Sequence, residues 1–141
     1  MGRERERENR SYTYLIVGLI VAILTFAFLL AAFGIVLNGN ISVRNLISYI
    51  VTAISFGVIS GTFHYFRLFV AFWLFILGIL VGFADMFRVF LVNDFGWNDL
   101  VGLMAFFSYV VIGFFAGLFF QAIHYLYKLY KAKRQRPPEI K

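Results

Sequence analysis

Most charged residues of this 141-residue chain lie at its two ends, and the few others separate long apolar runs. This distribution constrains the fold more than any other feature of the sequence. Residues 12–127 hold six charged side chains: Arg44, Arg67, Asp85, Arg88, Asp94 and Asp99. The apolar runs between them reach about 20 residues or more, the length a helix needs to cross the ~30 Å hydrocarbon core of a bilayer. The sequence therefore predicts a polytopic, all-α integral membrane protein.

Turn signals and chain length divide the apolar sequence into four predicted transmembrane helices. They are expected at about residues 12–37, 43–66, 68–92 and 99–127, between a charged N-terminal tail (1–11) and a basic C-terminal tail (128–141). Asn38-Gly39-Asn40 marks the first turn. No Gly or Pro separates the second and third helices. A single helix through both would be about 75 Å long, so the chain must turn tightly near residues 65–68.

Basic residues accumulate on one side of the predicted helices. With the N-terminus inside, eleven Lys and Arg residues fall on the cytoplasmic side, and only Arg44 and Arg88 fall outside. Because cytoplasmic segments of membrane proteins carry such an excess, we expect a multi-pass protein of the cell membrane with both termini in the cytoplasm. This topology accounts for the net charge of +6, so we predict no nucleic-acid partner. The last helix should extend inward as a basic, Tyr-rich segment, Tyr125–Arg136.

An internal similarity links the two halves of the chain. Aligning residues 12–67 with 72–127 without a gap gives ten identities, including His64-Tyr65 with His124-Tyr125, and these are the only two histidines. Matches of rarer residues carry more weight than matches of Leu or Phe. We interpret the halves as tandem helical hairpins, 12–67 and 68–127, related by a pseudo-two-fold axis along the membrane normal.

Small residues recur on the predicted helices at intervals of four residues. They are Ala53, Gly57 and Gly61 in the second helix, Gly78 and Gly82 in the third, and Gly113 and Gly117 in the fourth. Such faces let membrane helices approach closely, because packing drives helix association in lipid. We expect a compact four-helix bundle in which helices two and four meet through these faces at the pseudo-axis.

Few residues are candidates for chemistry. His64 and His124 are expected at equal depth near the cytoplasmic interface, as interfacial anchors, as a bis-His site for a b-type haem, or as a proton-handling pair. Asp85 and Arg88 are spaced for a local ion pair. The sequence has no cysteine and no metal-ligand cluster, phosphate loop or nucleophile–base pattern, so we predict no catalytic residue and no bound metal.

These features favour a non-enzymatic accessory, assembly or scaffolding subunit of a membrane complex. It would lie in the lipid bilayer, and its small-residue faces would contact a protein partner or a second copy. One alternative is a small transporter or channel at the repeat interface or in an oligomer, although polar residues are sparse for a channel in a monomer. The other is a haem-binding electron-transfer module.

Overall fold

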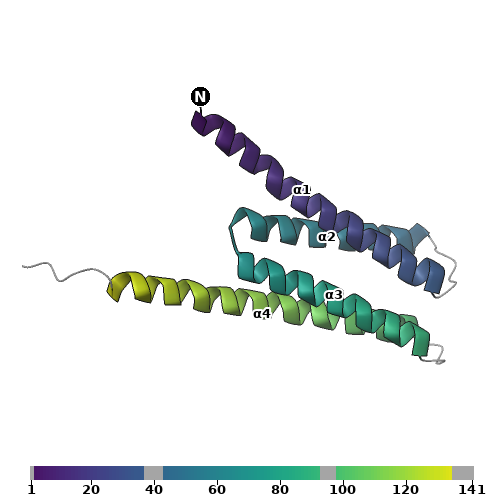
Figure 1. Cartoon of the computed structure of the whole chain (residues 1–141). Coiled ribbons are helices and arrows are strands. Elements are labelled where there is room, and N and C mark those ends of the chain that lie inside the picture. Colours follow the sequence, from purple (N-terminus) through teal and green to yellow (C-terminus); the bar gives the residue numbers. More distant parts are fainter. Residues whose placement is uncertain (1, 37–42, 93–97, 135–141) are drawn as a thin grey trace, which may run out of the picture.

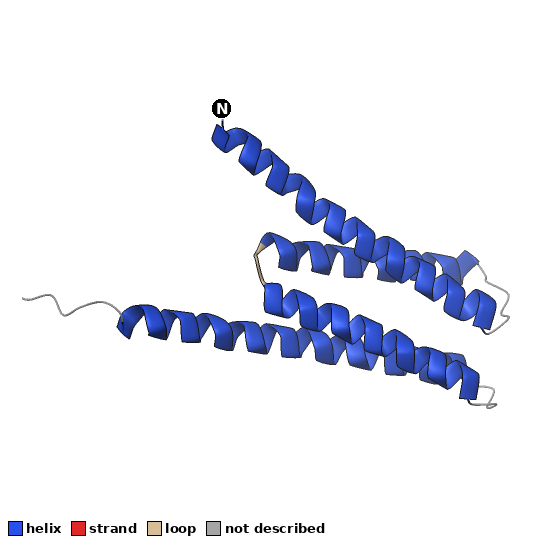
Figure 2. Cartoon of the chain, viewed as in Figure 1, coloured by secondary structure: helices blue, strands red, loops and turns tan. Residues whose placement is uncertain are grey.

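The computed structural model describes residues 2–36, 43–92 and 98–134, and for 2–11, 35–36, 98–99 and 133–134 the backbone alone. The helices are α1 (Gly2–Leu30), α2 (Val43–Tyr65), α3 (Phe69–Val92) and α4 (Asn98–Arg134), with a π-helical turn, Ala31–Val36, continuing α1 (Figure 1). Figure 2 shows that the described chain is helical apart from the short connection between α2 and α3, which is drawn in tan. This confirms the predicted all-α, four-helix fold. The turn Asn38–Asn40, the loop 93–97 and the end 135–141 lie outside the described residues.

Each helix contains a stretch long and apolar enough to cross a membrane. The stretches are Tyr12–Gly34, Val43–Tyr65, Phe69–Val92 and Leu100–Ala132. Large apolar side chains also point outward from every helix, as Leu19, Ile54, Leu77 and Met104 do. Backbone groups satisfied within helices, together with an apolar exterior, are what a lipid environment requires. Length, hydropathy and exposure are therefore those of a multi-pass membrane protein.

The four helices form two antiparallel hairpins in contact with each other. Helix α1 packs along α2, and α3 packs along α4, whereas α2 and α3 touch over a much smaller area. Figure 1 shows the two pairs one above the other, with α1 diverging toward its N-terminus. Both the N-terminal end of α1 and the C-terminal end of α4 project at the end of the bundle that holds the α2–α3 turn. We call this the tail end.

Glycines bring the backbones of α1 and α2 into contact. A Cβ atom at Gly18 would lie 2.7 Å from the carbonyl oxygen of Gly57, and one at Gly57 would lie 2.6 Å from the carbonyl oxygen of Gly18. Real Cβ atoms essentially never approach a backbone atom this closely. The helix spacing therefore requires glycine at both positions, as expected where lipid-embedded helices associate through packing.

The second hairpin is held in the same way. A Cβ at Gly78 would lie 2.8 Å from the carbonyl oxygen of Tyr109, and one at Gly113 would lie 2.9 Å from that of Leu74. A Cβ at Gly117 would lie 2.9 Å from the carbonyl oxygen of Ala71. The glycines of α2 and α4 thus face the neighbouring helix of their own hairpin. The expectation that α2 and α4 meet each other through these faces is wrong.

Phenylalanine rings join the two hairpins instead. Phe56 of α2 lies 5.8 Å from Phe75 of α3 and 5.9 Å from Phe106 of α4, measured between ring centroids. Phe63 of α2 stacks on Phe114 of α4 at 5.6 Å. Because α2 and α4 meet through long side chains, their backbones stay apart, and no small-residue spacing marks this interface in the sequence.

The π-helical turn places one ring against both hairpins. Phe33 stacks on Tyr49 of α2 at 5.1 Å and meets Phe90 of α3 edge-on at 5.4 Å. Its neighbour Ala32 is fully buried. A π turn changes the direction of the side chains that follow it along a helix. Here it turns the end of α1 toward the interface between the hairpins.

The two hairpins pack in different registers. The ungapped alignment equates Gly18 with Gly78, and Gly57 with Gly117. Gly18 lies against Gly57, whereas Gly78 lies against Gly113. Gly113 is about one helical turn from the aligned position, since a turn holds about 3.6 residues. The pseudo-two-fold relation therefore stays a sequence prediction.

The turn between α2 and α3 closes by a Schellman motif without glycine or proline. The backbone N–H of Leu68 donates to the carbonyl of Phe63 at 2.9 Å, and that of Arg67 donates to the carbonyl of His64 at 3.1 Å. These are the two hydrogen bonds of the motif. Arg67 occupies its left-handed position with φ of 56°, where glycine is usual.

Replacing Gly57 with Ala should destabilise the α1–α2 hairpin, because the new Cβ must displace the Gly18 carbonyl. We expect the free energy of unfolding to fall by about 1–3 kcal/mol, the usual cost of overpacking. Denaturant unfolding in mild detergent measures it. Gly61→Ala, one turn later, is the matched control, since its Cβ would lie 3.2 Å from the Tyr14 carbonyl oxygen and has more room. Equal effects of the two substitutions would contradict the close contact at Gly57.

Replacing Arg67 with Gly should stabilise the chain by about 1 kcal/mol, because an L side chain in the left-handed region costs about that much. Arg67→Ala serves as the control, since it removes the charge and keeps the unfavourable φ. Thermal unfolding of the three proteins compares them. An equal gain in Arg67→Ala would show that charge, and not backbone strain, is responsible.

Candidate functional site

The structure places the two histidines in different surroundings. His64 is partly buried, and its ring meets Phe69 and Phe72 of α3 edge-on at 6.3 and 6.2 Å. His124 is exposed on α4. Within the described chain, the two imidazoles do not touch each other, and neither lines the cavities described below. The similarity of the two histidines in the sequence is therefore not matched by similar surroundings in the described structure.

Asp85 and Arg88 form an ion pair along α3. Arg88 Nη1 and Asp85 Oδ1 are 3.6 Å apart, and the Arg88 side chain is 77% exposed while that of Asp85 is 25% exposed. Pairs with one exposed partner contribute little to stability. Among the described residues, no group of three or more His, Cys, Asp or Glu is placed to hold a metal ion. The pair is a local contact within one helix, between residues three apart in the sequence.

The interior of the bundle is filled by aromatic side chains rather than lined by polar ones. Phe75 and Phe106 are among its most completely buried residues. The buried hydroxyl of Ser60 has no hydrogen-bond partner, whereas Ser55 and Thr62 on the same helix donate to the carbonyl oxygens four residues earlier. The buried side chains of the described bundle are thus mainly apolar, with Thr25 and Ser60 as buried polar residues.

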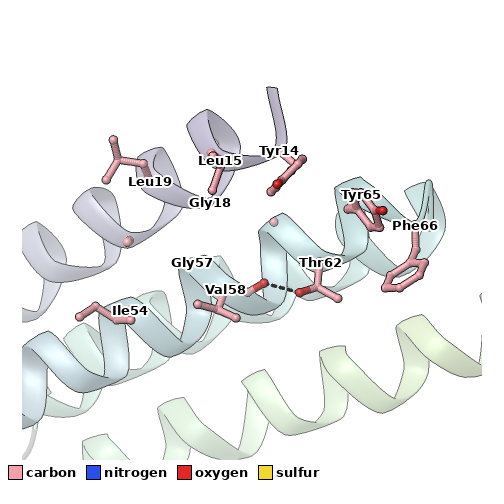
Figure 3. Close-up of a pocket in the computed structure, with 12 residues that line it drawn as sticks. Tyr14, Leu15, Gly18, Leu19, Ile54, Gly57, Val58, Thr62, Tyr65 and Phe66 are labelled. Carbon is pink, nitrogen blue, oxygen red and sulfur yellow. Dashed lines mark hydrogen bonds between the residues drawn. The ribbon is translucent and has the colours of Figure 1, made fainter. Parts of the chain in front are cut away.

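A groove runs between α1 and α2 on the outer face of the first hairpin (Figure 3). Its volume is about 540 Å³. The close approach of the two backbones forms its floor, and apolar side chains stand on both sides. We call it the α1–α2 groove. It is lined by Tyr14, Leu15, Gly18, Leu19, Ala22, Ile54, Gly57, Val58, Gly61, Thr62, Tyr65 and Phe66.

Polar groups gather at the tail end of the α1–α2 groove. The rings of Tyr14 and Tyr65 meet edge to face there, with centroids 5.3 Å apart (Figure 3). Thr62 Oγ1 donates to the Val58 carbonyl at 2.8 Å on the same stretch of α2. Phe66 ends the lining, and the exposed Arg67 follows it directly. The groove is therefore apolar along its length, with hydroxyl groups and a neighbouring cation at one end.

Helix α4 continues well past the start of α3. The backbone N–H of Val70 donates to Gln121 Oε1 at 3.1 Å, which fixes the level at which α3 begins against α4. Residues 122–134 lie beyond this level and span about 20 Å, at about 1.5 Å per residue (Figure 1). We call them the α4 extension. Every side chain described in it is exposed.

The α4 extension combines aromatic and basic side chains. Leu126, Tyr127 and Tyr130 are each more than 60% exposed. Its charged residues are all basic, namely Lys128, Lys131, Lys133 and Arg134. The α4 extension therefore presents apolar side chains together with charge of one sign.

Sequence reasoning anticipated the α4 extension and missed the α1–α2 groove. The absence of any breaker before Pro137 indicated a long last helix. The groove depends on which helix meets Gly57, and sequence spacing alone does not show the partner. Comparisons with protein-family models, curated proteins and solved structures find no match for this chain.

The unequal surroundings of the histidines predict unequal effects of their removal. His64→Ala should cost about 0.5–1.5 kcal/mol, because it removes two aromatic ring contacts. His124→Ala should stay within about 0.5 kcal/mol of the parent, as exposed positions usually do. Unfolding of both single variants and the double variant tests this. If the loss of unfolding free energy in the double variant differs from the sum of the two single losses by more than about 0.5 kcal/mol, the two imidazoles act together.

Proposed function

We propose that this chain is a non-enzymatic accessory or assembly subunit of a membrane complex. In this proposal, α1 to α4 cross the cell membrane and the tail end faces the cytoplasm. The orientation follows from the excess of Lys and Arg at that end. The observation that carries the proposal is the α4 extension, which leaves the bundle as an unpaired helix with every described side chain exposed.

The length of the α4 extension favours a protein partner over lipid alone. With the α2–α3 turn at the membrane surface, the headgroup layer would cover roughly 5–8 Å of the extension. The remaining helix reaches the cytoplasm with Leu126, Tyr127, Leu129 and Tyr130 uncovered. Apolar side chains on an exposed helix gain most by packing against an apolar groove in a partner.

The chemistry of the α4 extension indicates what its partner offers. Tyrosine is enriched among residues that dominate binding energy, because its ring packs while its hydroxyl finds a hydrogen bond. Lys128 and Lys131 add positive charge without a compensating acid in residues 122–134. A partner with an apolar groove and an acidic rim complements this surface.

The other functions expected from the sequence receive less support from the geometry. A transporter or channel needs a polar path, and the described core is packed with rings such as Phe75 and Phe106. A haem module needs two facing ligands, whereas His64 packs on Phe69 and Phe72 of α3 and His124 is exposed on α4. The small-residue faces that could mediate self-association already hold α1 to α2 and α3 to α4.

The partner is tested by purifying the full-length tagged chain in mild detergent at native expression and quantifying co-purifying chains. We expect the parent chain to retain one partner chain in near-stoichiometric amount. The double variant Tyr127→Ala/Tyr130→Ala should retain at least about tenfold less of that partner, because it loses the dominant contacts. The matched control is Phe115→Ala/Phe119→Ala, which removes two similarly exposed rings from the part of α4 that precedes the α4 extension. Equal retention by both double variants, or no stoichiometric partner, would contradict the proposal.

A further inference from the structure

We infer that the α1–α2 groove binds one anionic phospholipid, with an acyl chain along its apolar length and the phosphate at the end closed by Tyr14 and Tyr65. This inference uses the membrane insertion proposed above and does not depend on the α4 extension. It assigns a ligand to a cavity that the accessory role leaves unused.

The dimensions of the groove select a single hydrocarbon chain. Its lining on α2 runs from Ile54 to Phe66, about 18 Å along a helix that rises about 1.5 Å per residue. A volume of about 540 Å³ over that length gives an open groove with a mean cross-section of roughly 30 Å². A helix with its side chains is about 10 Å across and would rest on the rims of the groove without filling it. A hydrocarbon chain fits, because contacting carbon atoms lie about 4 Å apart.

The floor of the groove also argues against a second copy of this chain as the occupant. A helix would dock through backbone contact with small residues. Gly18 and Gly57 already make that contact with each other and hold α1 against α2. The surface left for a ligand is formed largely by the branched apolar side chains of Leu15, Leu19 and Val58. Such walls adapt to an acyl chain better than to the fixed ridges of a helix.

The polar end of the groove fits a phosphate group. The hydroxyls of Tyr14 and Tyr65 can donate hydrogen bonds to phosphate oxygens, and amphipathic rings of this kind favour the headgroup level. Arg67, exposed and directly after the last lining residue, supplies the cation. Residues 64–69 contain no acid to offset it. A guanidinium pairs with phosphate through two parallel hydrogen bonds, which favours an anionic headgroup over a zwitterionic one.

The test is native mass spectrometry of the purified full-length chain, titrated with phosphatidylglycerol or phosphatidylcholine of identical acyl chains. We expect one phosphatidylglycerol per chain, held more tightly than phosphatidylcholine. Leu15→Trp should weaken that binding about tenfold or more, because the indole fills the groove. Leu77→Trp on α3 is the matched control, since Leu77 is 55% exposed, Leu15 is 57% exposed, and Leu77 lines neither described cavity.

A second pair of variants tests the headgroup separately. Arg67→Gln should weaken phosphatidylglycerol binding about fivefold, the change expected when one basic residue is lost near an anionic lipid, and should leave phosphatidylcholine binding unchanged. Arg44→Gln, at the start of α2 and the opposite end of the bundle, should change neither. If Leu15→Trp does not fold, Val58→Phe fills the groove from α2 and takes its place.

Three results would overturn the inference. They are equal binding of the two lipids by the parent chain, equal effects of Leu15→Trp and Leu77→Trp, and a dimer that Leu15→Trp disrupts. The partner proposal fails independently, because Tyr127→Ala/Tyr130→Ala should leave lipid binding intact. Conversely, Leu15→Trp should leave the co-purifying partner in place.

Discussion

Direct contact between helix backbones at glycine is the interaction on which the rest of this structure depends. In lipid, an apolar side chain gains nothing by leaving its surroundings, so helices associate where their surfaces fit closely. Gly18 against Gly57 and Gly78 against Gly113 provide that fit, each with room for no Cβ atom. Side chains beside such a contact must stand away from it, and in the first hairpin they become the walls of the α1–α2 groove.

Two kinds of packing therefore hold the bundle together. Glycines hold the helices of each hairpin at short distance, and phenylalanine rings such as Phe56 and Phe63 join the hairpins at longer distance. The second kind tolerates a difference in register between the hairpins, because rings can meet at several angles. Helix α4 continues past the start of α3, and this α4 extension is the proposed docking surface.

Apolar length and charge placement were enough to predict four helices, because a bilayer fixes how long an apolar helix must be. The small-residue faces could also be predicted from the sequence. Their spacing indicates which face of a helix carries small residues, but it does not indicate which helix packs against that face. The Phe56 contacts could not be predicted, because 19 phenylalanines give no distinctive pattern. The paired histidines suggested a site by sequence symmetry, yet the register of α4 leaves His124 exposed while His64 packs on α3.

Nuclear Overhauser contacts in the full-length chain, labelled at Gly, Ala and Phe and held in bicelles, test the central claim most directly. Contacts are predicted from the Ala22 methyl group to Gly57 and from Gly78 to Gly113, because a Cβ at Gly57 would lie 2.9 Å from Ala22 Cβ, and one at Gly78 would lie 3.1 Å from Gly113 Cα. Ring contacts are predicted between Phe56 and Phe106. A contact between Gly57 and Gly117 in place of these would show that α2 and α4 meet through their small faces and would contradict this account.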